Sequence, residues 1–105
     1  MTVGPNSFHK VMFLHDLQIG DIVQIQLNNT TTTFAKETNN YARFSEDEIA
    51  HSRVKGIVTN VAVRPDLYAK ETVVELVSST KNGFVKTIPV LQSEMQEVIR
   101  ILFTA

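Results

Sequence analysis

The stretch RVKGIVTNVAV, residues 53–63, decides the fold because its apolar residues fall on both faces of the strand that it predicts. Alternation gives one face Val54, Val58 and Ala62 and the other face Ile57, Val61 and Val63. A strand with two apolar faces is covered on both sides, or it bends from one layer of the structure to another. Gly56 marks the place where such a bend is favoured.

Three further segments predict strands around this one. DIVQIQL, residues 21–27, alternates apolar and polar residues cleanly and predicts a half-buried strand. ETVVELVS, residues 71–78, predicts the strand that follows residues 53–63. FHKVMFL, residues 8–14, is apolar without a clean period, so it fits either a first strand or a packed N-terminal arm. Because short turns, and no long helical crossovers, separate most of these segments, we expect an antiparallel sheet.

The segment Lys81-Asn82-Gly83-Phe84 predicts a tight hairpin, since Asn-Gly is the preferred pair of a type I′ turn. A two-residue turn here would set Val77 opposite Ile88 and Leu76 opposite Pro89. Proline has no N–H for a ladder of hydrogen bonds, so the strand after this turn is expected either to lie at the edge of the sheet or to end at Pro89.

A short helix is predicted near residues 45–53. Ser45 and Glu48 have the spacing of a capping box, in which each side chain accepts a hydrogen bond from the backbone N–H of the other. Phe44 and Ile49 occupy the two positions of a hydrophobic staple around that cap. The C-terminal segment, residues 93–103, fits either one helix or a single turn at 93–96 followed by a closing strand. The second is favoured by its terminal Val, Ile and Phe residues.

The region 28–44, NNTTTTFAKETNNYARF, is a long polar loop within a larger insertion at about 28–53. Residues 30–34 have high β-propensity, so part of the loop is expected to be a short strand. The whole chain, residues 1–105, then forms a single mainly β domain: a small antiparallel β-barrel with one short helix and a C-terminal turn or helix. This layout resembles an SH3-like barrel in architecture, and no sequence motif supports a closer family.

Composition narrows the functional classes. The chain has 105 residues, 43% hydrophobic and 20% charged, with a formal net charge of −1 and no cysteine. Thiolate chemistry and thiolate zinc sites are therefore excluded, and strong general attraction to nucleic acid is not expected. His9, His15 and His51 lack the spacing of a metal site, and we interpret His51 as structural, near a helix end with Asp47 four residues before it. We expect no enzyme activity, metal or cofactor, no membrane association and a cytoplasmic location.

The most promising residues for binding are aromatic and basic side chains in predicted loops. Exposed tyrosine beside arginine is typical of protein-binding hot spots. The predicted partner-binding residues are Tyr41, Arg43, Arg64, Tyr68, Lys36 and Lys70. We interpret the chain as a non-catalytic protein-binding or regulatory module that uses the 28–44 loop and adjacent turns. The alternatives are a small barrel that binds single-stranded nucleic acid and a structural subunit of a larger assembly, and self-association is left open.

Overall fold

A computed structural model describes residues 7–39, 43–64, 71–79 and 85–102 of the chain. Its sheet follows the order β1-β6-β2-β3-β4-β5, with every neighbouring pair antiparallel. Two α-helices and two 3-10 turns complete it. The elements are β1 (Ser7–Val11), η1 (Leu14–Asp16), β2 (Ile22–Leu27), α1 (Asn29–Glu37), α2 (Glu46–His51), β3 (Arg53–Arg64), β4 (Glu71–Ser79), β5 (Val85–Leu91), η2 (Gln92–Glu94) and β6 (Met95–Leu102).

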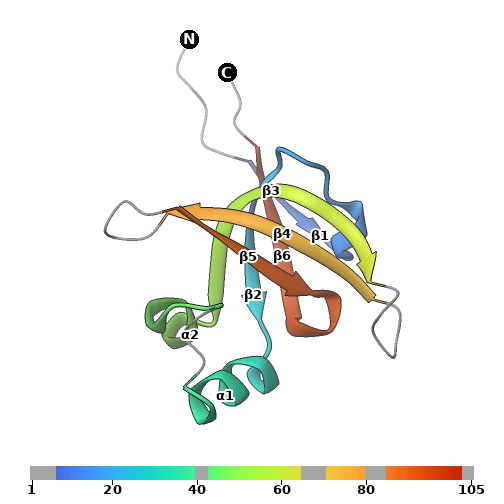
Figure 1. Cartoon of the computed structure of the whole chain (residues 1–105). Helices are drawn as coiled ribbons and strands as arrows, with labels where there is room; N and C mark the ends of the chain where they lie inside the picture. Colours follow the sequence, from blue (N-terminus) through green and yellow to red (C-terminus); the bar gives the residue numbers. More distant parts are fainter. Residues whose placement is uncertain (1–6, 40–42, 65–70, 80–84, 103–105) are drawn as a thin grey trace.

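The long strand β3 belongs to both layers of the molecule. Figure 1 shows β1, β6 and β2 on one side and β4 and β5 crossing on the other, with β3 arching between them. Gly56 permits this close crossing, because a Cβ atom at residue 56 would lie only 2.6 Å from the carbonyl oxygen of Val77. The mainly β, antiparallel prediction is confirmed, but the sheet is not closed: β1 and β5 stand at the two ends of the order. A barrel is therefore not shown.

The expected alternation along β3 is wrong beyond residue 58. Val58 is opposite Leu76 but Asn60 is opposite Glu75, so one extra residue is inserted as a β-bulge. The bulge reverses which side chains face inward. Val61 consequently packs against the core together with Val58, although the alternation had assigned them to opposite faces.

The predicted register of the β4–β5 hairpin is also wrong, by one residue. Leu76 is opposite Ile88, and Glu75 is opposite Pro89. A slip of one residue turns the other face of a strand toward the core, and here it buries Leu76 with Ile88 in place of Val77 with Ile88. The Asn-Gly turn that motivated the prediction lies outside the described residues. The edge position of the Pro89 strand, β5, is confirmed.

The region 28–44 contains a helix, α1, where the sequence predicted a loop with a short strand. Asn28 caps this helix by accepting a hydrogen bond from the N–H of Thr31 at 2.9 Å. It also donates from Nδ2 to the carbonyl of Ser93 at 2.7 Å, which fastens the start of the helix to η2. Thr32 and Ala35, three residues apart, are the buried residues of the helix. This anchoring outweighs the β-propensity of the four threonines.

The remaining local predictions are confirmed. The α2 helix begins after Ser45, and both hydrogen bonds of the capping box with Glu48 are present. Phe44 and Ile49, the predicted staple, are both buried. The C-terminus forms a single 3-10 turn followed by the strand β6, as favoured. Within the described part of the chain, no helix is long and apolar enough to cross a membrane.

Candidate partner-binding surfaces

Arg43, one of the predicted binding residues, is engaged in an internal ion pair. Its two terminal nitrogens donate to the two carboxylate oxygens of Glu94. The guanidinium also lies 4.3 Å from the centroid of the Phe44 ring, and Glu94 accepts a further hydrogen bond from the N–H of Leu91. Both side chains of the pair are mostly shielded from water. Bidentate geometry of this kind fixes the relative orientation of the two side chains in addition to pairing their charges.

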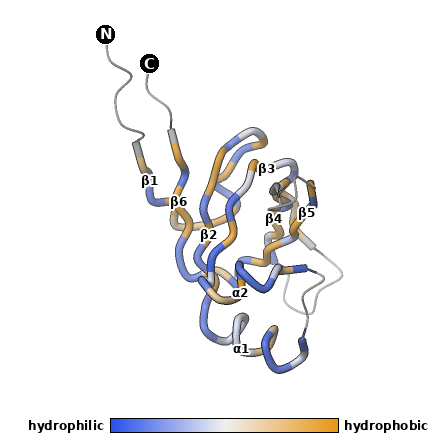
Figure 2. The backbone as a smooth tube through the Cα atoms, turned by 90° about the vertical axis from the view of Figure 1, so that its left-hand side faces the viewer, coloured by the Kyte–Doolittle hydropathy of each residue, from blue (hydrophilic) through white to orange (hydrophobic). Residues whose placement is uncertain are grey.

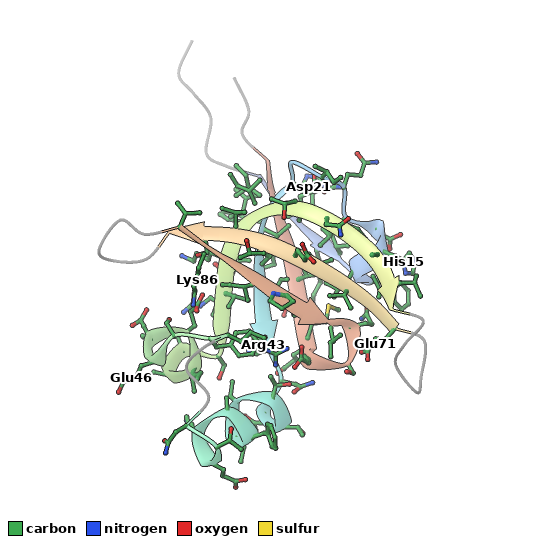
Figure 3. The ribbon with its side chains drawn as sticks, in the orientation of Figure 1. His15, Asp21, Arg43, Glu46, Glu71 and Lys86 are labelled. Carbon is green, nitrogen blue, oxygen red and sulfur yellow. The ribbon has the colours of Figure 1, made fainter. Side chains whose placement is uncertain are left out.

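A second ion pair lies at the same helical end of the molecule. The Nζ of Lys86 is 2.8 Å from Oε1 of Glu48 and 3.4 Å from the carbonyl oxygen of Arg43. Together the two pairs join α2 and the segment before it to β5 and η2. Figure 3 labels the two basic members, Arg43 and Lys86. We call these four residues, Arg43, Glu48, Lys86 and Glu94, the clasp. Arg43 thus connects the segment before α2 to η2, and its guanidinium already has a partner in the Glu94 carboxylate.

The other predicted binding residues are not brought together by the described structure. Lys36 is exposed on α1, and the backbone of Arg64 pairs with Glu71 at the end of β3. Tyr41, Tyr68 and Lys70 lie outside the described residues. Lys36 therefore remains as the one predicted side chain that is both described and freely exposed.

A surface that the sequence did not predict crosses the outer face of the sheet. Ile22 on β2 is directly opposite Ile57 on β3 and Ile101 on β6. Ile101 is in turn opposite Phe8 on β1, and Ile57 is opposite Val77 on β4. Because directly opposite residues project from the same face, the five side chains form one continuous apolar line across five strands. We call it the outer row: Phe8, Ile101, Ile22, Ile57 and Val77.

The outer row is accessible to a partner. Phe8 is 66% exposed and Ile57 is 47% exposed, while the other three side chains are partly exposed. The core residues of the same strands, among them Val23 and Ile25, point to the opposite face and are fully buried. Figure 2 shows hydrophobic and hydrophilic stretches along both β2 and β6. Among the described residues, the outer row is therefore apolar surface that remains at least partly exposed.

Basic residues flank the outer row on one side. The next line of opposite residues contains Lys10, Ile99, Gln24 and Lys55. Arg53 follows, two residues before Lys55 on β3, and it is also exposed. The one acid on this flank in the described strands is Glu97, which lies 3.5 Å from Lys10. The apolar row thus borders a surface with an excess of positive charge.

The outer row escaped prediction because it depends on the strand order. In the sequence, Ile22 and Ile101 are 79 positions apart and show no relation to each other. They become neighbours only because β6 lies between β1 and β2 in the sheet. The apolar residue at position 22, on the otherwise polar face of β2 with Gln24 and Gln26, was the available signal.

No significant match to a protein family, a curated protein or a solved structure is found for this chain. Among the residues that the structure describes, no three His, Asp or Glu side chains converge into a group that could hold a metal ion.

Proposed function

We propose that this chain is a non-catalytic protein-binding module and that the outer row is the centre of its binding surface. The observation that carries the proposal is the uninterrupted apolar line from Phe8 to Val77, with its most exposed side chains at Phe8 and Ile57. Contiguous exposed apolar surface rimmed by polar groups marks interaction sites.

The composition of the surface supports a protein partner. Interfaces have an apolar centre that includes aromatic side chains, surrounded by a polar rim. Here Phe8 and three isoleucines form the centre, and Lys10, Lys55 and Arg53 lie along the rim. Full burial of one Ile or Phe side chain contributes about 1.5–3 kcal/mol, so covering the exposed part of several such residues would give a substantial driving force.

The region 28–44 is retained as a second surface of the same module, because Lys36 and the neighbouring Phe34 are exposed on α1. Its Thr33, also exposed, allows the two surfaces to be compared by matched substitutions. We also propose that the bent sheet is an open relative of the small SH3-like barrel that the order of elements resembles.

Binding of single-stranded nucleic acid is a second candidate function, because Phe8 lies beside Lys10 on β1 and exposed aromatic and basic residues together can stack bases and contact phosphates. Titration with short RNA and DNA at low and high salt tests it. Phosphate contacts predict a steep loss of affinity as salt rises, and failure to bind at low salt would exclude this function.

The protein-binding proposal is tested by capture from a lysate of the native host with Ile57→Glu and Thr33→Glu variants. Both place the same charge on an exposed residue, one in the outer row and one on α1. We expect the proteins captured by the unmodified chain to be retained by Thr33→Glu and lost by Ile57→Glu. Loss with Thr33→Glu alone would identify the 28–44 region as the surface, and loss with neither would refute both assignments. Circular dichroism checks that each variant is folded.

A further inference from the structure

We propose that β1 accepts an added strand from a partner protein, and that this strand carries an acidic residue between two apolar residues, in the pattern apolar–x–acidic–x–apolar. The proposal rests on the protein-binding function above and specifies the chemistry of the partner. Two observations support strand addition: β1 is an edge strand of the sheet, and its outer face carries apolar and basic side chains.

The sheet has two edge strands, and they differ in their capacity to pair. β5 contains Pro89, which cannot donate a backbone hydrogen bond, and its Lys86 is held by Glu48 in the clasp. β1 contains no proline, and β6 is the one strand that pairs with it in the described structure. An edge strand presents backbone N–H and C=O groups that an added strand can use. β1 is therefore the open edge.

The outer face of β1 carries an apolar and a basic side chain, Phe8 and Lys10, which project there with the outer row. A second apolar residue, Met12, follows Lys10 at the same two-residue spacing, in the bend directly after the strand. Met12 is 74% exposed, and the Lys10 side chain is 72% exposed. The pairing of Lys10 with Glu97 at 3.5 Å is a surface ion pair, which contributes little to stability. Lys10 is thus available to a new acidic neighbour.

A second copy of this chain is a poor occupant of the edge in the register that pairs its apolar residues. If two copies joined through antiparallel β1 strands, the register that sets Phe8 against Met12 would also set Lys10 against Lys10. Like charges directly opposite each other across a strand pair are destabilising. A strand with an acid at the central position instead places opposite charges together and extends the outer row at both flanking positions.

A hollow lies beside the end of β1 that leads into η1. This hollow has a volume of about 350 Å³ and is lined by Lys10, Val11, Met12, Phe13, Asp16 and Arg100. Nε of Arg100 is buried and makes no hydrogen bond to the described residues, and the Arg100 guanidinium is 3.8 Å from Asp21. Threonine suits the intervening positions of the added strand because it is β-branched and favours strands.

The test uses the full chain and a fluorescently labelled peptide of seven residues, with valine at the second and sixth positions, glutamate at the fourth and threonine elsewhere. Fluorescence anisotropy measures its binding. We expect saturable binding at least tenfold tighter than that of the same peptide with lysine at the fourth position. In Lys10→Glu this preference reverses, and in Lys10→Gln, which removes the charge without repelling Glu97, it disappears.

Two backbone-modified peptides separate strand addition from nonspecific apolar contact. One carries N-methyl groups on the odd residues and the other on the even residues, because alternate residues of a strand direct their N–H toward a given neighbour. We expect one of the two to lose at least tenfold in affinity and the other to bind nearly as the parent does. Equal binding by both, or binding by none of the peptides, overturns the proposal.

The two proposals fail in distinguishable ways. If Ile57→Glu abolishes capture from the lysate while the peptide does not bind, the protein-binding function stands and strand addition at β1 is wrong. If the peptide binds as expected while capture is insensitive to Ile57→Glu, strand addition stands and the outer row is not the centre of the binding surface.

Discussion

Two apolar rows cross the same strands of this sheet, one on each face, and only one of them is buried. The inner row consists of opposite residues on β1, β6, β2 and β3, namely Val11, Val98, Ile25 and Val54. All four are buried in the core. The outer row begins three residues away on β1, at Phe8, and remains accessible. Similar side chains on the same strands thus occupy opposite environments.

The difference shows that apolar character alone does not assign a residue to the core. The bend of β3 brings β4 over the inner face, and no layer formed by residues 7–39, 43–64, 71–79 or 85–102 covers the outer face. The inner row is therefore expected to determine stability, and the outer row to determine association. Substitutions that are chemically alike and differ only in the face that they alter test this division.

The largest effect is expected from Ile25→Ala, which removes a fully buried side chain from the inner row. The free energy of unfolding should fall by about 2–5 kcal/mol, because the change loses apolar burial and leaves a cavity. Denaturant unfolding measures this loss. Ile22→Ala is the matched control: it is the same substitution on the same strand, but in the outer row, and it should cost less than half as much. Equal losses would contradict the division between the rows.

A smaller effect is expected from Gly56→Ala, which tests the bend that creates the two environments. The added methyl group would meet the Val77 carbonyl oxygen at 2.6 Å and the Leu76 Cβ at 3.2 Å, so β4 must shift. Overpacking of this kind costs about 1–3 kcal/mol, measured by the melting temperature or by denaturant unfolding. A variant as stable as the unmodified chain would show that β4 does not pack so closely at this point.

The smallest effect on stability is expected from Ile57→Thr in the outer row. Threonine is also β-branched and suits a strand, so the free energy of unfolding should change by less than about 1 kcal/mol. Partner capture should nevertheless weaken, because the polar hydroxyl interrupts the apolar line. A large loss of stability would mean that Ile57 belongs to the core after all.

Local signals predicted the elements that depend on neighbouring residues. The Ser45–Glu48 box identified α2, and the alternation in residues 21–27 identified β2 with its buried Val23 and Ile25. The helix α1 was missed because its cap is supported by a contact between Asn28 and Ser93, 65 residues apart. The register of β4 and β5 was missed because it follows from burying Leu76 against Ile88, which a turn sequence does not encode.

The candidate site was predicted least well, because it depends on the strand order. Arg43 and its neighbours were selected for their composition, whereas the structure pairs Arg43 with Glu94 from the far end of the chain. The outer row joins residues from position 8 to position 101. No window of sequence contains it, and only the placement of β6 between β1 and β2 assembles it.

That placement also constrains how the protein acquires its structure. β6 lies between β1 and β2 and follows both in the sequence, so within the described structure β1 has no strand partner until residues 95–102 have left the ribosome. The meander of β3, β4 and β5 can form earlier from local contacts. Pairings between distant residues form slowly, and β1 and β2 are exposed during the delay. We therefore expect truncation before residue 95 to leave an aggregation-prone chain in which β1 has lost its place in the sheet.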